Sequence, residues 1–366
     1  MNIKDLIKKI YIKIKYIFGY FKYVVNKDII IQNIDADEEL FKIYNPPSST
    51  PLTVNKIDKI EYDLMIIIPA FNSEQWIKEC IDSIVTQKTE YTYLTVIIDD
   101  GSTDMTGNII DSYLENENIK IIHQDNKGYS GARNVALKCI KSKYIMFVDS
   151  DDLLLPCAIQ ALLSKAYETN ADIVEGNGYS FNEKGIISKI KEDYESYWGG
   201  PVLKVMKSKL WEKIEFPEGY LYEDTIIESL VFQIAKKIIC IPNEVYAYRI
   251  HNNSITQKHD NNVKRLDSYW IMKLLFETQK AMGISIDYSN YRRVMKHIIY
   301  TYRRTILLSE EAKKNIFIGT CEFVTLNFNN YMCEKDEYYF LAKAFMKRDY
   351  RKYIIYCEEL TKWVKK

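Results

Sequence analysis

Residues 144–152 read YIMFVDSDD, an apolar run that is closed by a cluster of acidic residues. A continuous apolar run of this length is typical of a strand buried on both faces of a parallel sheet. Carboxylates one residue apart at the end of such a strand repel each other unless something positive binds them. Their oxygens suit a hard divalent cation, which usually shares its ligands with phosphate. Asp149 and Asp151 are therefore the central candidate metal ligands.

The sequence before this stretch alternates between the patterns of strands and helices. A run at 64–68 is closed by Pro69, and Asn72 or Ser73 can cap the helix expected after it. The alternation predicts an α/β domain with a mostly parallel sheet, in which ligands bind at the carboxyl ends of the strands. The expected elements are strands at 64–68, 94–98, 119–122 and 144–148, and helices at 76–85, 106–114 and 130–140.

Composition excludes several classes of protein. The 366 residues include 50 basic and 50 acidic side chains, whereas a nucleic-acid-binding protein normally has a net basic balance. With 47% hydrophobic residues the chain is not a disordered one. Seven cysteines without a CxxC pair indicate reduced thiols and a cytoplasmic location. No run of about 20 apolar residues indicates a membrane-spanning helix.

The first 25 residues, MNIKDLIKKIYIKIKYIFGYFKYVV, are basic and aromatic. Lysine interrupts every stretch long enough for the apolar core of a signal peptide, so none is expected. Two interpretations remain open for this segment. It is either a helix lying on an anionic inner leaflet, which makes the protein peripheral at the cytoplasmic face, or an amphipathic helix packed on its own domain.

Three further motifs each allow a functional and a structural interpretation. Asp99 and Asp100 at the end of the second strand either accept hydrogen bonds from a nucleotide or cap a strand-to-helix turn. The loop 126–134, NKGYSGARN, either presents backbone amides and Arg133 to a diphosphate or is a plain surface loop.

The third motif is Glu223-Asp224, which precedes an apolar stripe with helical spacing at 226–234. Acidic residues there either satisfy the helix dipole or include a general base for an acceptor hydroxyl. Further along, His251 is a third metal ligand, a phosphate contact or an ordinary exposed histidine.

These motifs occur in one order that resembles the family 2 glycosyltransferases with the GT-A fold. The resemblance runs over residues 62–260 and is carried by 66–87 (IIIPAFNSEQWIKECIDSIVTQ), 96–104 (VIIDDGSTD), 126–137 (NKGYSGARNVAL), 144–152 (YIMFVDSDD), 216–219 (FPEG), 223–224 (ED) and 248–256 (YRIHNNSIT). It implies a GT-A nucleotide-diphospho-sugar transferase fold, a mostly parallel sheet flanked by helices, with a helical C-terminal region.

The resemblance also implies a role for each matched residue. Asp149 and Asp151 would bind Mn²⁺ or Mg²⁺, and Asp224 would be the catalytic base with Glu223 in support. His251 would contact the diphosphate or the metal. The implied donor-binding residues are Pro69, Ala70 and Phe71 beside the base, Glu74 near the ribose, Asp99 and Asp100 on the base, and Asn126, Gly128, Arg133, Asp149 and Ser150.

The implied reaction is metal-dependent transfer of a sugar from a nucleotide-diphospho-sugar, with UDP the expected nucleotide. The acceptor would be a hydroxyl of a glycan or lipid-linked glycan, and a single displacement would invert configuration. The alternatives are a polyprenyl-phosphate glycosyltransferase, which usually lacks the segment 216–224, and a catalytically inactive glycan-binding protein. The intact Asp149, Asp151 and Asp224 argue against the second alternative.

The expected organisation has three parts. Residues 1–60 form a basic amphipathic extension, and 61–260 form the catalytic domain, with a nucleotide-binding half at 61–152 and an acceptor half at 153–260. Residues 261–366 form a helical region, for which three uses remain open. It shapes the acceptor site, forms a homo-oligomer, or holds the enzyme near a lipid-linked acceptor.

Overall fold

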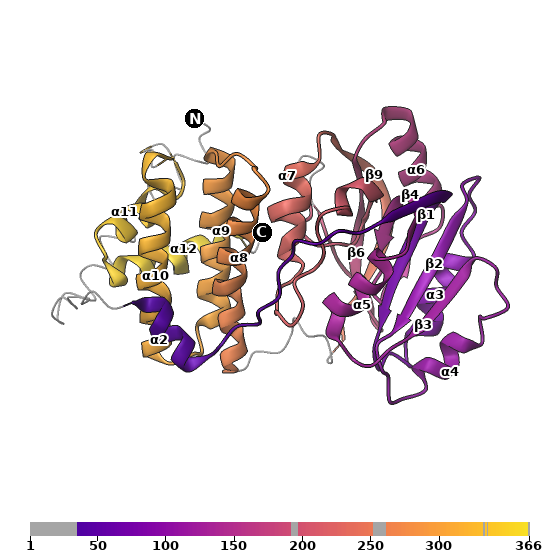
Figure 1. Cartoon of the computed structure of the whole chain (residues 1–366), viewed down its shortest axis with the longest axis horizontal. Coiled ribbons are helices and arrows are strands. Elements are labelled where there is room, and N and C mark those ends of the chain that lie inside the picture. Colours follow the sequence, from indigo (N-terminus) through magenta and orange to yellow (C-terminus); the bar gives the residue numbers. More distant parts are fainter. Residues whose placement is uncertain (1–34, 192–196, 252–260, 332–333, 335, 365–366) are drawn as a thin grey trace. The chain divides into compact units, whose positions relative to one another are not determined.

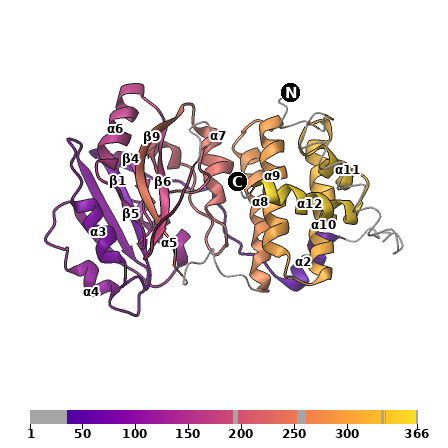
Figure 2. The same ribbon diagram turned by 180° about the vertical axis from the view of Figure 1, so that it is seen from behind.

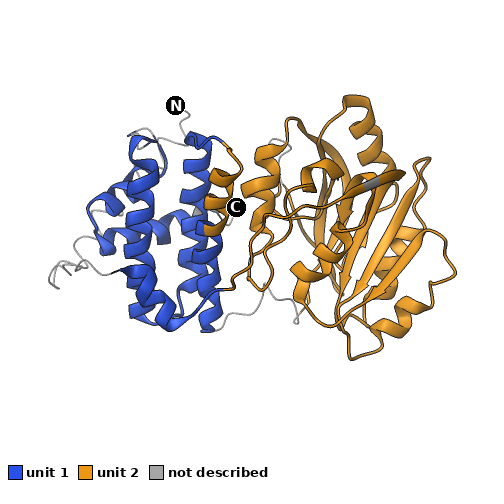
Figure 3. Cartoon of the chain, in the orientation of Figure 1, with its two compact units in different colours: residues 1–46, 260–273, 285–366 blue, residues 47–259, 274–284 orange. Residues whose placement is uncertain are grey.

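The computed structural model describes residues 35–364 except 192–196, 252–260, 332–333 and 335. The chain forms two compact units, residues 47–259 with 274–284, and residues 1–46 with 260–273 and 285–366 (Figure 3). The segment 1–25, for which a membrane contact and packing on its own domain are both open, lies outside the described residues. Among the helices that are described, none has the length and apolar character needed to cross a membrane.

The first half of the larger unit is the predicted α/β arrangement (Figure 1). Its strands are parallel in the order β3-β2-β1-β4, so the carboxyl ends of all four lie at one edge. Each strand is rich in Ile, Val or Met, and the core residues Ile66, Ile97 and Met146 are fully buried. The elements are β1 (Ile57–Ala70), α3 (Ile77–Val85), β2 (Tyr93–Asp99), α4 (Thr106–Asp111), β3 (Ile119–His123), α5 (Gly128–Leu137) and β4 (Ile140–Phe147).

Beyond β4 the sheet becomes mixed and continues in the order β8-β6-β9-β5, with β7 paired to β6. Strand β8 is antiparallel to both β4 and β6, while β6 and β9 are parallel. The elements of this half are β5 (Leu153–Leu154), α6 (Ala158–Thr169), β6 (Ile173–Asn182), β7 (Gly185–Lys189), β8 (Lys204–Lys207), η1 (Ser208–Trp211), η2 (Ile227–Val231), α7 (Phe232–Ile234) and β9 (Ile238–Arg249).

Three local predictions are wrong. The helix expected over 106–114 ends at Asp111, where turns follow α4. The helix expected over 130–140 ends at Leu137, because Ile140 already pairs with β1 as the first residue of β4. Neither Asn72 nor Ser73 caps α3, which begins at Ile77 without a side-chain cap. Asn72 instead has a left-handed backbone (φ 48°), and its side-chain oxygen accepts the N–H of Thr103 at 2.8 Å.

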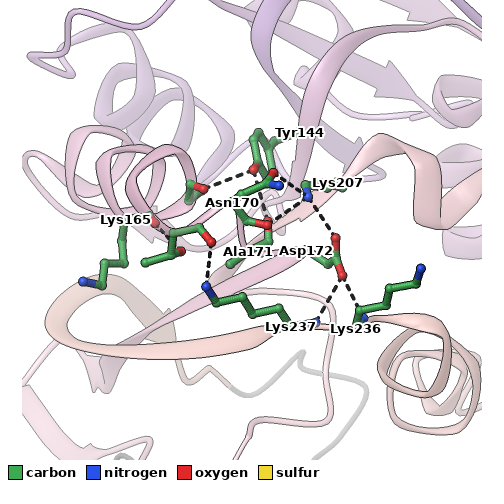
Figure 4. A network of polar contacts seen from close by, with 10 residues as sticks. Tyr144, Lys165, Asn170, Ala171, Asp172, Lys207, Lys236 and Lys237 are labelled. Atoms are coloured by element: carbon green, nitrogen blue, oxygen red, sulfur yellow. Dashed lines mark hydrogen bonds and ion pairs between the residues drawn. The ribbon is translucent and has the colours of Figure 1, made fainter.

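A polar network joins the ends of β6, β8 and β9 at the edge of the sheet opposite the carboxyl end of β4 (Figure 4). Asp172 accepts Lys207 Nζ at 3.0 Å and the N–H of Lys236 at 2.7 Å. Lys207 Nζ also donates to the main-chain oxygen of Asn170 at 3.0 Å, where α6 ends. Because these residues lie just before β6 and β9 and at the ends of β8 and α6, the network ties these ends together.

The smaller unit is helical, which confirms the expectation for the C-terminal region (Figure 2). Although it comes from the N-terminal part of the chain, α2 packs here, because Asp37 accepts the Tyr269 hydroxyl at 2.6 Å and pairs with Lys273. Gly319 on α10 leaves room for this contact, since a Cβ there would lie 2.1 Å from the Tyr269 hydroxyl. The helices are α2 (Ala36–Ile43), α8 (Asp267–Ala281), which continues into the larger unit, α9 (Tyr288–Thr305), α10 (Glu310–Phe328), α11 (Tyr339–Met346) and α12 (Tyr350–Val364), with the short turns η4 (Val263–Leu266) and η5 (Asn329–Tyr331).

Candidate active site

The acidic loop follows β4 directly, at the carboxyl edge of the parallel strands. The side chains of Asp149 and Asp151 are 27% and 30% exposed, so both reach solvent from a mostly enclosed position. Ser150 between them is buried. The structure therefore places both acidic side chains at the end of this strand, and their role as metal ligands stays a prediction.

Arg133 links this loop to the Glu223-Asp224 turn. Its Nη2 donates to Asp149 Oδ1 at 3.0 Å and its Nη1 to Glu223 Oε1 at 2.9 Å. The guanidinium is buried and lies over the ring of Phe216, 5.2 Å from its centroid. Burial raises the pKa of Asp149 and of Glu223, and the Arg133 charge acts in the opposite direction. One cation thus joins two carboxylates that are distant in sequence.

The segment 216–219 is held by the same helix that carries Arg133. Asn134 forms two hydrogen bonds with the main chain of Phe216, donating to its oxygen at 2.9 Å and accepting its N–H at 2.8 Å. Ser130 donates to the oxygen of Pro217 at 2.9 Å. Ser130, Arg133 and Asn134 have the i, i+3, i+4 spacing of one helix face. Sequence reasoning gave no role to Ser130 or Asn134, although this spacing was a usable signal.

Asp224 presents a carboxylate with no hydrogen bond or ion pair to any residue that the structure describes. Its charge nevertheless raises the pKa of Asp149 and Glu223, so it lies close to both. The preceding Tyr222 has a left-handed backbone (φ 66°), which costs about 1–2 kcal/mol for a residue with a side chain. The predicted helix follows and includes the π-helix η2, a form often found at functional sites.

His251 meets the second carboxylate of the acidic loop. Its Nε2 lies 2.7 Å from Asp151 Oδ2, and its ring packs on Trp76 with a centroid distance of 4.0 Å. Within the described part of the chain, the buried Nδ1 of His251 has no hydrogen-bond partner. The structure therefore places His251 at the acidic loop and leaves one ring nitrogen uncommitted.

Arg249, Tyr246 and Asp152 form a support for the acidic loop that sequence reasoning missed. The fully buried Asp152 accepts the Tyr246 hydroxyl and the N–H of Arg249, each at 2.7 Å. Arg249 Nε donates to the main-chain oxygen of Asp151 at 2.7 Å. Burial raises the pKa of Asp152 and of Tyr246. The sequence shows Asp152 only as a third acid, with no sign that it faces inward.

Asp99 and Asp100 take part in turns at the end of β2. Asp99 Oδ1 accepts the N–H of Ser102 at 3.1 Å, and its Oδ2 lies 2.9 Å from His123 Nδ1. Asp100 Oδ1 accepts Gln124 Nε2 at 2.6 Å and the N–H of Lys127 at 2.9 Å. The bond from Ser102 to Asp99 is within the turn after β2, whereas the bonds of Asp100 go to the loop after β3, and α4 has no side-chain cap. The bonds of Asp100 leave its Oδ2 without a hydrogen-bond partner in the described chain, so the nucleotide role stays a prediction.

The loop 126–128 packs against this turn. Asn126 Nδ2 donates to the main-chain oxygen of Asp100 at 2.9 Å. Gly101 has a left-handed backbone (φ 73°), and a Cβ there would lie 3.0 Å from the nitrogen of Asn126. Gly128, also left-handed, begins α5. The structure thus brings the two predicted donor-binding loops into contact.

The remaining predicted donor residues lie where β1 ends. Pro69 and Ala70 are buried, whereas Phe71 is 40% exposed. Glu74 accepts the N–H of Met105 at 2.8 Å, in the turn before α4. The four predicted donor residues lie at the same sheet edge as Asp99, where donor-binding residues are expected. Their roles stay predictions.

The acidic loop suits a divalent cation in its chemistry. No three His, Cys, Asp or Glu side chains converge as a ready-made metal cluster within the described ranges. Asp149 Oδ2 and Asp151 Oδ1 nevertheless have no hydrogen-bond partner among those residues. Mg²⁺ is commonly held by one or two carboxylates together with substrate phosphates and water. Two carboxylates with one uncommitted oxygen each fit that mode of binding.

The mixed sheet, with its acidic loop after β4, has the GT-A fold. The structure of Staphylococcus aureus TarS residues 1–349 in complex with UDP-GlcNAc matches this fold with a TM-score of 0.65. The match covers 82% of this chain and 92% of that chain at 19% identity. Residues 65–227 match the family described as Glycosyl transferase family 2, so the chain contains a domain of this family.

Relatives in two bacteria support the same assignment. Glycosyltransferase GlyA of Streptococcus pneumoniae is 33% identical over 227 residues, which are 54% of this chain and 32% of GlyA. The poly(ribitol-phosphate) beta-N-acetylglucosaminyltransferase TarP of Staphylococcus aureus is 29% identical over 266 residues, 68% of this chain and 80% of TarP. The match thus spans about a third of the length of GlyA and most of TarP. The predicted family membership is confirmed.

Proposed function

We propose that this glycosyltransferase moves a hexosyl or N-acetylhexosaminyl group from a UDP-sugar to a hydroxyl of a glycan or lipid-linked glycan. The observation that carries the proposal is the uncommitted Asp224 carboxylate beside the Arg133-bridged pair of Asp149 and Glu223. The UDP-GlcNAc in the TarS structure and the N-acetylglucosaminyltransferase activity of TarP support the choice of donor.

In this reaction Asp224 takes the proton of the acceptor hydroxyl as the oxygen attacks the anomeric carbon. Attack from the face opposite the leaving diphosphate inverts configuration in one displacement. Glu223 stays paired with Arg133 and keeps the turn in place, so that Asp224 remains the available base. Arg133 also places a positive charge beside the acidic loop, where the donor diphosphate would lie.

Asp149 and Asp151 would hold Mn²⁺ or Mg²⁺, and His251 would be a further ligand or a phosphate contact. When bound, the ion neutralises charge on the leaving diphosphate. The nucleoside would lie along the ends of β1, β2 and β3, against Phe71 and Asp100 and near the loop 126–128. The further donor contacts in the proposal are Pro69, Ala70, Glu74, Asp99, Gly128 and Ser150.

Donor binding should depend on the metal. We expect UDP with Mn²⁺ or Mg²⁺ to raise the melting temperature, because a ligand at 100 times its Kd stabilises by about 2.7 kcal/mol. EDTA should abolish both this shift and sugar transfer, and added metal should restore them. Thermal shifts with a panel of nucleoside diphosphates and nucleotide sugars are the measurement. Full stabilisation and full transfer in chelator would remove the metal from the proposal, and no shift with any nucleotide would remove the donor.

We also propose that residues 1–25 bind the cytoplasmic face of a membrane, supported by their lysines and aromatics. Deleting them should reduce co-sedimentation with anionic vesicles while leaving binding to neutral vesicles low in both forms. Equal sedimentation of the full and the truncated chain with anionic vesicles would contradict this contact.

A further inference from the structure

A buried group of charges lies in the second half of the sheet, outside the site described above. Glu175 on β6 and Lys204 on β8 are both 0% exposed, and their side chains pair at 2.9 Å. Lys191 is also buried and donates to Glu175 at 2.6 Å. Burying three charges is costly unless every one is paired. Packing alone therefore does not explain why these charges are buried.

Most of the hydrogen bonds of this group go to one short piece of main chain. Lys204 Nζ donates to the main-chain oxygens of Trp198 at 2.7 Å and Gly200 at 2.6 Å. Glu175 Oε1 accepts the N–H of Trp198 at 2.9 Å. The backbone of Trp198 is therefore held on both its N–H and its C=O by charged groups that water does not reach. Hydrogen bonds of this kind are about twice as strong as neutral ones.

The side chain on this fixed backbone is a large apolar ring facing solvent. Trp198 is 40% exposed and the adjacent Tyr197 is 46% exposed. The indole lies across Gly200, where a Cβ would come within 2.7 Å of its Nε1. Tyr197 packs edge-on against Phe232 at 5.8 Å. An exposed aromatic residue on a mobile loop would lose entropy on binding, whereas this one is already ordered.

The same loop touches the helix that follows the proposed base. A Cβ at Gly199 would lie 3.1 Å from a carboxylate oxygen of Glu228, which is four residues beyond Asp224. The loop that carries Trp198 thus contacts η2, the helix that follows Asp224 in the chain.

We propose that Trp198 is a stacking platform for a pyranose ring of the acceptor. The apolar C–H face of a pyranose matches an exposed indole, and the indole N–H is a donor for a sugar hydroxyl. The charged group of Glu175, Lys191 and Lys204 holds the platform, and Gly200 sets the orientation of the ring. This inference rests on the proposed function, because it names the acceptor side of the same reaction.

The test compares variants in transfer to a panel of methyl glycosides, with the UDP-sugar that the thermal screen selects. Trp198→Ala should raise the acceptor KM about tenfold with a much smaller change in kcat, and Trp198→Phe should recover most of the loss. Gly200→Ala should also raise KM, because the new methyl displaces the indole. Ile187→Ala, at another exposed apolar residue on β7, is the matched control and should leave KM unchanged.

A second measurement does not depend on turnover. The ¹⁵N resonance of the Trp198 indole, assigned by its loss in Trp198→Phe, should shift when methyl glycosides are added to the UDP-bound enzyme. An unchanged KM in Trp198→Ala, or an indole resonance that no glycoside moves, would overturn the platform. If UDP still raises the melting temperature in that case, the proposed donor site stands. If UDP does not bind the parent, the proposed function itself fails.

Discussion

Asp224→Asn is expected to lower the rate of sugar transfer about 1,000-fold, because a positioned general base contributes roughly 10²–10⁴. The amide has nearly the same shape as the carboxylate and cannot accept the proton of the acceptor hydroxyl. Folding should be unaffected, since Asp224 makes no hydrogen bond or ion pair with the described residues that the change would break. Stability should even rise slightly, because a negative charge next to Asp149 and Glu223 is removed.

The measurement is single-turnover transfer together with the UDP-induced melting shift. UDP and metal should stabilise Asp224→Asn as much as the parent, which separates loss of the base from loss of donor binding. Asp82→Asn is a matched control, because it changes an aspartate of the same charge in a surface pair with Lys78 on α3. Transfer at the parental rate by Asp224→Asn would show that another group is the base.

The first half of the larger unit was predictable because its signals are local. A buried parallel strand is a continuous apolar run, and the loop that follows it appears in the sequence as a break in that run. Asp99 and Asp149 could therefore be placed at the same sheet edge from the sequence alone. The errors at Ile140 and Asn72 are of one kind. Each concerns the residue at which an element begins or ends, and contacts with a neighbouring strand or loop determine that residue.

The contacts that complete the site were not predictable, because they join residues far apart in the chain. Arg133 and Glu223 are 90 positions apart, one on α5 and the other in the turn before η2. Nothing in the sequence pattern shows that the guanidinium of Arg133 points at Glu223 as well as at Asp149. Asp152 is a similar case. Its inward orientation depends on Tyr246, which β9 supplies from 94 positions further on.

The same limit applies to the buried charges at Glu175 and Lys204. In the sequence they are an acid and a base inside short apolar runs, where solvent exposure is the usual expectation. The sheet buries both completely. A buried pair of this kind gives a large and specific prediction for stability.

Glu175→Gln should lower the free energy of unfolding of the larger unit by about 3–5 kcal/mol, because it leaves Lys204 buried without a counter-charge. For a unit of this size that corresponds to a fall in melting temperature of about 10 °C. Burial already lowers the pKa of Lys204, and the charge of Glu175 opposes that shift. Without Glu175 the folded-state pKa falls further below the unfolded value. The unfolded variant then binds more protons than the folded one, so its stability rises with pH.

Thermal unfolding of parent and variant from pH 7 to about pH 10 is the measurement, and the difference between them should shrink as the pH rises toward the ordinary pKa of lysine. Glu168→Gln is the matched control. It breaks the exposed pair with Lys165, in which the glutamate side chain is 66% exposed, and should cost less than about 1 kcal/mol at every pH. A Glu175→Gln deficit as small as that of the control would mean that Lys204 reaches water or another anion. A large deficit that does not change with pH would mean that lost packing, and not the unpaired lysine charge, destabilises the variant.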